Sequence, residues 1–227
     1  MRVTDTLQTE FTELPLEPVE TLLGKEEVLK KIEALHGLST IKSWHLELFN
    51  PGRRFKRTFK LTLSDGSRTI RLILKFHKRN VAERFEREIG PRQEPDFIPF
   101  APVFFGSYSR VRTTRRNQEF TDGDYRVIIE DYIDGEDLID TFTGTLTDDQ
   151  KWAATEQAVL LYERIGERSI PRGWQLNNVN PRNVRFPHGG GSPLVVDWGG
   201  QTAVDPRAYQ RLIRDRLWEC FLGVGLK

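Results

Sequence analysis

Four side chains, far apart in the 227-residue sequence, are of types that could form one phosphate-binding site: Lys75, Glu88, Asn183 and Asp197. A lysine that projects from a strand can hold phosphate oxygens, and a neighbouring carboxylate can fix the position of its ammonium group. Magnesium prefers hard oxygen ligands, such as the amide oxygen of Asn183 and the carboxylate of Asp197. Together these residue types predict phosphate chemistry assisted by a metal ion.

Lys75 falls on a predicted strand, residues 69–77, whose two faces differ. Its apolar face consists of alternate residues: Ile70, Leu72, Leu74 and Phe76. The other face carries Arg71, Ile73 and Lys75. Lys75 is therefore expected to project away from the core.

Two further strands are expected before it, and they complete an antiparallel meander. In the first, Trp44, Leu46 and Leu48 share a face before a turn at Asn50-Pro51-Gly52. The second has the same alternation over 59–63, and the Ser64-Asp65-Gly66-Ser67 sequence predicts the hairpin into the Lys75 strand. Residues 102–108 and 125–132 supply two more strands, separated by a polar loop.

Glu88 is expected on a short helix over residues 80–89 that Pro91 ends. Phe85, three residues earlier, would anchor this helix to the sheet, and Glu88 is one candidate partner of Lys75. Glu83 and Glu86 remain competitors because the segment offers three carboxylates.

Helices are predicted at both ends of the chain. Residues 1–20 favour an extended arm, followed by a helix over 25–36 with Gly37 as its C-terminal cap. From Thr147 the chain becomes helical, with a capping box at Thr147 and Gln150. A last helix begins at Asp205-Pro206.

The order of these segments resembles the protein-kinase-like superfamily, in particular its aminoglycoside- and choline-kinase-like small bacterial branch. Five segments carry the resemblance: RLILKF, ERFEREI, VIIEDYIDGEDL, NVNPRNVRF and VVDWGG. Weaker similarities are to lipopolysaccharide-kinase-like, RIO-like and YrbL-like proteins, some of which are equally short after the last motif. The resemblance implies an α+β, two-lobed fold with a five-stranded antiparallel N-lobe, one inserted helix and a reduced helical C-lobe.

The resemblance also implies ATP and Mg²⁺ as cofactors. Lys75 would hold phosphates with Glu88 as its partner, and Asn183 and Asp197 would bind the metal. The backbone around Glu130, Asp131 and Tyr132 would face adenine, while Asp137 would reach the ribose hydroxyls. The boundaries that it implies are an N-terminal arm and helix over 1–40, an N-lobe over 41–132 and a C-lobe over 133–227.

Two features depart from the family pattern. The phosphate-covering loop is Asn50-Pro51-Gly52-Arg53-Arg54, with a single glycine, so the charge of Arg53 or Arg54 would have to replace backbone cradling. The catalytic aspartate of the family corresponds to Asn178, five residues before Asn183, and the family histidine corresponds to Leu176. No acidic residue occurs between Ser169 and Val196 to replace the missing base.

Three explanations of Asn178 stay open: an engineered Asp-to-Asn variant, a natural pseudokinase that binds nucleotide for regulation, or a transfer reaction that needs no base there. The preferred function is an ATP- and Mg²⁺-dependent phosphotransferase acting on a hydroxyl of a small molecule, glycan or protein. The alternatives are a catalytically dead regulatory module, or an interaction domain whose basic loop (110–116) binds RNA or an anionic surface.

Composition adds few constraints. The formal net charge is +1, which does not favour nucleic acid as a partner, and a single cysteine excludes an internal disulfide. No segment has the apolar length of a membrane span or the pattern of a signal peptide, so a cytoplasmic location is expected.

Overall fold

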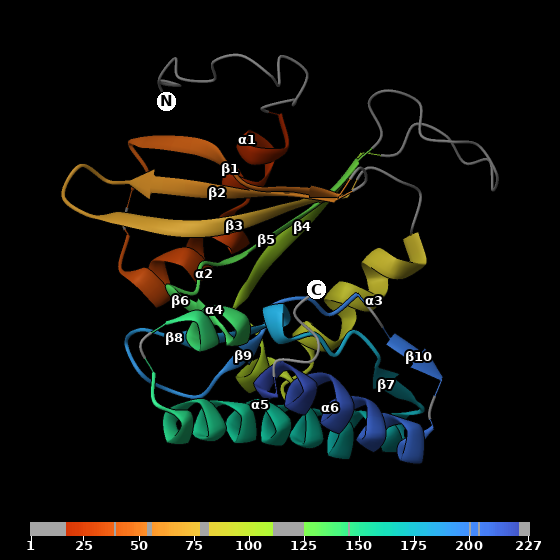
Figure 1. Ribbon diagram of the computed structural model, residues 1–227. Coiled ribbons are helices and arrows are strands. Elements are labelled where there is room, and N and C mark those ends of the chain that lie inside the picture. Colours follow the sequence, from red (N-terminus) through yellow and green to blue (C-terminus); the bar gives the residue numbers. More distant parts are fainter. Residues whose placement is uncertain are drawn as a thin grey trace. The chain divides into compact units, whose positions relative to one another are not determined.

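The computed structural model of the chain divides into two compact units (Figure 1). The first comprises Met1–Ala82 and Val103–Tyr132, and the second Glu83–Pro102 and Ile133–Lys227. The residues that the structure describes are 17–38, 40–53, 56–77, 82–110, 125–144, 146–199, 201–203 and 205–222.

The first unit is built on a five-stranded antiparallel sheet of order β1-β2-β3-β5-β4. Its strands are β1 Ser43–Arg53, β2 Lys56–Ser64, β3 Thr69–His77, β4 Phe104–Arg110 and β5 Tyr125–Asp131. The predicted hairpin joins β2 to β3, where the Asp65 carboxylate accepts hydrogen bonds from the backbone N–H groups of Ser67 and Arg68. Gly66 takes φ 93° in this turn, a value that favours glycine. The predicted sheet is confirmed.

One face of this sheet forms the core of the first unit together with two helices, α1 (Glu17–Leu23) and α2 (Glu26–His36). The sheet contributes Leu61, Leu72 and Leu74, all fully buried, and the helices contribute Leu22 and Ile32. Helix α2 ends where predicted, with Gly37 in the left-handed conformation and its N–H donating to the Glu33 carbonyl oxygen.

Two local predictions for the first unit are wrong. The extended arm was expected to reach residue 20, but α1 begins at Glu17 because Pro18 suits the first turn of a helix and Val19 is buried. The expected turn at Asn50-Pro51-Gly52 is instead an irregular part of β1, with register shifts on both sides of Asn50. Proline is tolerated there because β1 is an edge strand of the sheet.

The second unit is mainly helical, with short strands. Its helices are α3 Ala82–Gln93, η1 Ile98–Phe100, α4 Leu138–Thr143, α5 Asp148–Ser169, η2 Ile170–Arg172, η3 Pro181–Asn183 and α6 Pro206–Phe221. Its strands are β6 Gly135–Asp137, β7 Trp174–Leu176, β8 Val184–Pro187, β9 Leu194–Val195 and β10 Gln201–Ala203. Strands β6, β8 and β9 form one small sheet, and β7 pairs with β10.

Helices α5 and α6 enclose the core of the second unit with buried side chains such as Tyr162, Ile165 and Tyr209. The predicted capping box opens α5: Gln150 N–H donates to Thr147 Oγ1, and Thr147 N–H donates to Gln150 Oε1. Asp205 accepts a hydrogen bond from Ala208 N–H at the start of α6, as its position before Pro206 predicts.

The predicted end of the helix that carries Glu88 is wrong. Helix α3 continues past Pro91 to Gln93. A proline normally disfavours helical geometry in the residue before it, partly through a clash with that residue's Cβ. Here the preceding residue is Gly90, which has no Cβ, so the helix can continue for a few residues.

Among the described residues, no helix combines the length and the apolar character needed to cross a membrane.

Candidate active site

Lys75 lies on β3 and, as predicted, on the face opposite to the core formed by Leu72, Leu74 and Phe76. Its Nζ atom is 2.8 Å from Glu130 Oε1 on β5. Both residues are almost completely buried, with relative exposures of 5% for Lys75 and 2% for Glu130. The phosphate-binding candidate therefore has a carboxylate partner within its own sheet.

The strand register explains this contact. In the antiparallel β3–β5 ladder, Ile73 is opposite Glu130 and Lys75 is opposite Ile128. Lys75 and Glu130 are thus diagonal neighbours on one face, a distance that a long lysine side chain can span. The sequence had suggested only the backbone of Glu130, for adenine. Its side chain was overlooked because the register of strands so distant in sequence is not visible from alternation.

Asp131 is the last residue of β5, and Tyr132 follows it. The Asp131 N–H donates to the Val103 carbonyl oxygen, so this donor is used within the first unit. The ring of Tyr132 contacts Phe49 edge-on, with centroids 5.9 Å apart, and the Arg71 guanidinium lies 6.0 Å from the Tyr132 ring. The role of this segment at adenine stays a prediction.

Asp131 also approaches His36, with Oδ1 3.0 Å from Nε2. Burial raises the pKa of the Asp131 carboxyl above its ordinary value of 3.8, although the nearby His36 opposes the rise. This contact joins the C-terminal end of α2 to the end of β5.

Two other predicted site residues, Glu88 and Arg53, belong to other elements, α3 and β1. Glu88 lies on α3 with a relative exposure of 1%, in the second unit, and its pairing with Lys75 stays a prediction. Arg53 closes β1, but its side chain lies outside the described part of the chain, as do Arg54 and residues 111–116 of the basic loop.

In the second unit, the structure brings Asn178 and Asn183 together. The Nδ2 group of Asn183 donates to the carbonyl oxygen of Asn178 at 3.2 Å. Asn183 ends the short helix η3, which Asn180 caps by accepting from Arg182 N–H. Because the amide nitrogen of Asn183 is used in this way, its Oδ1 is directed elsewhere and can act as a ligand.

Asp197 follows β9 and lies next to the same loop. The backbone N–H of the preceding residue, Val196, donates to the Asn183 carbonyl oxygen at 2.9 Å. Asp197 Oδ1 accepts from Gly199 N–H at 3.3 Å. The next residue, Trp198, is fully buried, and its indole N–H donates to the Val195 carbonyl oxygen, which holds the turn in place.

Tyr162 of α5 supports this loop from the core, a role that the sequence did not suggest. Its hydroxyl donates to the Asn178 carbonyl oxygen at 3.4 Å, and Tyr209 donates to the Tyr162 carbonyl oxygen at 3.0 Å. Burial raises the pKa of the Tyr162 phenol, and the negative charge of Asp197 adds to the rise.

Asp137 caps a helix and contacts the loop. Its Oδ1 accepts from the N–H groups of Ile139 and Asp140 at the start of α4, both at 2.9 Å. Its Oδ2 is 3.7 Å from an Arg182 guanidinium nitrogen. The predicted ribose contact of Asp137 would therefore have to use an oxygen that already faces Arg182.

The donor set at Asn183 and Asp197 fits Mg²⁺. Magnesium commonly takes only one or two protein ligands, and its other ligands are water and phosphate oxygens. Within the described residues there is no cluster of three histidine, cysteine, aspartate or glutamate side chains that could hold a metal by itself. At Asn183 and Asp197, phosphate and water oxygens would have to supply the remaining ligands.

Comparisons with known proteins give fold information only. No protein-family model matches the chain, and no curated protein matches its sequence. Among solved structures, the PknI kinase domain of Mycobacterium tuberculosis has a TM-score of 0.52 at 18% identity, covering 82% of this chain and 77% of PknI. WaaP in complex with acyl carrier protein has a TM-score of 0.54 at 14% identity, covering 93% and 81%.

A third structure, the kinase PK-1 of Cydia pomonella granulovirus, has a TM-score of 0.53 at 13% identity, covering 85% of this chain and 73% of PK-1. All three are similar over most of both chains. With the five-stranded sheet and the helical second unit, these likenesses show that the chain has the fold of the protein-kinase-like superfamily.

Proposed function

We propose that this chain binds ATP with Mg²⁺ and transfers a phosphoryl group to a hydroxyl of an acceptor. The main support is the arrangement of Asn178, Asn183 and Asp197, which hydrogen bonds hold on neighbouring segments of the second unit. The buried ammonium group of Lys75, on the non-core face of the N-terminal sheet, is the second support.

In this proposal Lys75 holds phosphate oxygens, and Asn183 and Asp197 supply the protein ligands of the metal. When bound, Mg²⁺ would neutralise charge on the phosphates. The bond from the γ-phosphorus to the bridging oxygen of ADP breaks, and a bond to the acceptor oxygen forms. The hydroxyl proton passes to water or to a phosphoryl oxygen, because the Asn178 amide cannot accept it.

The absence of a base at Asn178 sets the expected rate. Loss of a general base typically costs ~10²–10⁴ in rate. Since the transition state of phosphoryl transfer is loose, positioning and charge neutralisation can still support a slow reaction. We therefore propose a slow phosphotransferase, with ATP binding as its most robust property.

The second candidate is a nucleotide-binding pseudokinase that acts through a partner. The observation that favours it is the same asparagine, together with the lack of any acidic residue from Ser169 to Val196. WaaP, which is similar in fold, has been solved in complex with acyl carrier protein, so a protein partner is a reasonable class for this chain as well.

Nucleotide binding is tested on the full chain by thermal shift with ATP, with and without Mg²⁺. We expect a stabilising shift that Asp197→Ala abolishes and that Asp215→Ala, an exposed acidic position on α6, leaves intact. The absence of any shift for the unmodified chain would reject nucleotide binding altogether.

Turnover separates the two candidates. With a panel of hydroxyl acceptors, ADP release by Asn178→Asp should exceed that of the unmodified chain by ~10²–10⁴. If Asn178→Asp binds nucleotide but releases no ADP above background, the pseudokinase is the better description.

A further inference from the structure

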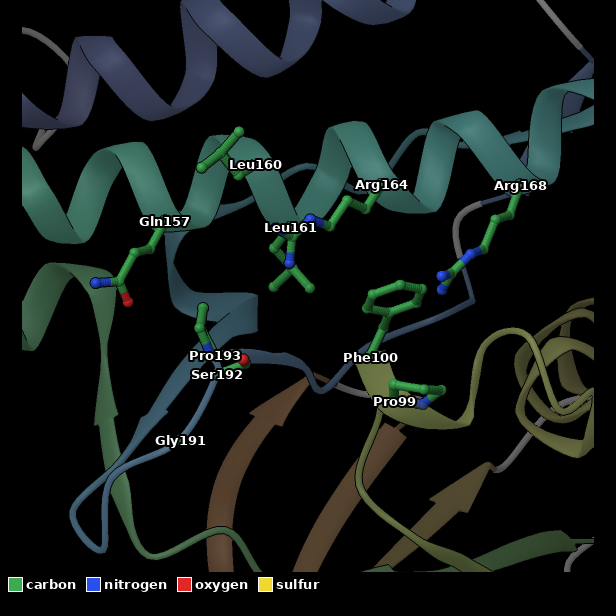
Figure 2. Close-up of a pocket in the computed structure, with 10 residues that line it drawn as sticks. All are labelled: Pro99, Phe100, Gln157, Leu160, Leu161, Arg164, Arg168, Gly191, Ser192 and Pro193. Atoms are coloured by element: carbon green, nitrogen blue, oxygen red, sulfur yellow. The ribbon is translucent and has the colours of Figure 1, made fainter.

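A pocket of about 460 Å³ lies within the second unit (Figure 2). Three segments line it: η1, helix α5 and the turn between β8 and β9. Its apolar part includes Phe100, Leu161 and Pro193, all buried. Pockets of this size accommodate a small molecule or a few side chains of a partner.

The polar part of the pocket carries one sign of charge. Arg164 and Arg168, one turn apart on α5, both line it, and no aspartate or glutamate is among its ten lining residues. The whole chain has a formal net charge of only +1, so the positive charge here is local. Such a pocket favours an anionic group beside an apolar one.

The two arginines differ in how they are held. The Arg168 guanidinium stacks on Phe100 at 4.4 Å from the ring centre (Figure 2). It also donates to the Asp96 carbonyl oxygen at 2.8 Å. Arg164 is exposed and has no hydrogen bond or ion pair with any residue in the described part of the chain. Arg168 is therefore pre-organised, while Arg164 can turn its planar fork of donors to a carboxylate.

Two exposed apolar side chains lie on the segments that form the pocket. Leu160, one of its lining residues, is 42% exposed, and Ile98, which precedes the lining residue Pro99 in η1, is 49% exposed. A single small anion would leave both uncovered, whereas a peptide with successive side chains could cover them. Gln157 and Ser192, also in the lining, offer hydrogen bonds to a peptide backbone.

We propose that this pocket docks a short segment of a partner protein in which an acidic side chain lies beside a bulky apolar one. The carboxylate would pair with Arg164 and Arg168, and the apolar side chain would pack on Phe100 and Leu161. None of the lining residues belongs to the proposed catalytic set.

The test is a selection of short random peptides against the full chain, followed by fluorescence anisotropy with the enriched peptides. We expect enrichment of sequences that combine an acidic and a bulky apolar residue. Arg164→Glu should weaken their binding by ~10-fold or more, because it places like charges opposite each other. Leu160→Ser should weaken it as well, and higher salt should do the same by screening the charges.

Matched controls are Arg211→Glu, an exposed arginine on α6, and Leu35→Ser, an exposed leucine on α2. Both should bind as the unmodified chain does, and unchanged melting temperatures would show that every variant is folded. Failure to enrich any acidic peptide, or equal binding by Arg164→Glu, overturns the proposal. Binding of phosphatidylglycerol vesicles in place of peptides would also overturn it and assign the pocket to anionic lipid.

Discussion

The ammonium group of Lys75 lies 2.8 Å from the carboxylate of Glu130, on the neighbouring strand of the same sheet, and water reaches neither group appreciably. Burying two charges is costly, and their attraction offsets that cost only while both are present. The pair thus links the stability of the first unit to the residue that we expect to hold phosphates.

Removal of one member of this pair should therefore be strongly destabilising. Glu130→Ala is expected to lower the free energy of unfolding by about 3 kcal/mol, because it removes a carboxylate from beside a buried ammonium group. Urea denaturation measures this change. Lys75→Met combined with Glu130→Ala should cost less than the sum of the two single changes.

Lys60 and Glu47 provide the control for that cycle, because they form an ion pair between β1 and β2 at a more exposed position. Glu47→Ala should cost at most about 1 kcal/mol, since water screens the pair. Equal losses for Glu130→Ala and Glu47→Ala would contradict the importance of burial.

Asn183 and Tyr162 both donate to the carbonyl oxygen of Asn178, which allows support of the loop to be separated from metal binding. Asn183→Ala and Tyr162→Phe should each lower the free energy of unfolding by about 1 kcal/mol through loss of one hydrogen bond. Only Asn183→Ala should remove the dependence of ATP binding on Mg²⁺, measured by titration calorimetry. Loss of that dependence in Tyr162→Phe would show that the amide oxygen of Asn183 is not the decisive ligand.

Asp131 should make stability depend on pH. Its carboxyl has a raised pKa in the folded chain, so between 3.8 and that raised value the folded state binds more protons than the unfolded state. The contribution of Asp131 to the free energy of unfolding therefore falls as pH rises through this window. The unfolding free energy of Asp131→Asn, relative to the unmodified chain, should rise over the same window and then level off. Denaturation curves at several pH values check this, and a difference that stays constant with pH would refute it.

A substitution at Gly135 would test how closely β6 packs against β8, next to Asp137. A Cβ atom on Gly135 would lie only 2.0 Å from the carbonyl oxygen of Phe186 on β8. Gly135→Ala should therefore force β6 and β8 apart and destabilise the second unit by about 3 kcal/mol. Gly189→Ala, where a Cβ atom meets open space, should change stability by less than about 1 kcal/mol. Similar melting temperatures for the two variants would count against this packing.

Local patterns in the sequence predicted the strands well, because alternation reports which face of a strand is buried. In β3, the residues expected in the core are those that pack there, and Lys75 projects from the opposite face. The caps at Thr147 and Asp205 were equally visible, since each depends on only a few neighbouring residues. The family motifs assigned Asn183 and Asp197 to one metal site; the segments that carry them adjoin, and their role as ligands stays a prediction.

Contacts between distant segments were not predictable in this way. The Lys75–Glu130 pair depends on the register between β3 and β5, and the contact of Tyr162 depends on how α5 packs beneath a loop. The rules that proline ends a helix or a strand also failed at two positions, because the structural context of each proline made it tolerable. Gly90 lets α3 pass Pro91, and the edge position of β1 tolerates Pro51 within the strand.

The close packing of helix α2 on the sheet has a consequence for the production of shortened chains. A Cβ atom on Gly106 of β4 would lie 2.8 Å from a methyl group of Val28, so helix and strand meet at a point with no room for another carbon. Expression of a shortened chain that begins at residue 41 would leave the leucines and phenylalanines of that sheet face in water. Such a fragment should collect in inclusion bodies, so soluble preparations will need both N-terminal helices.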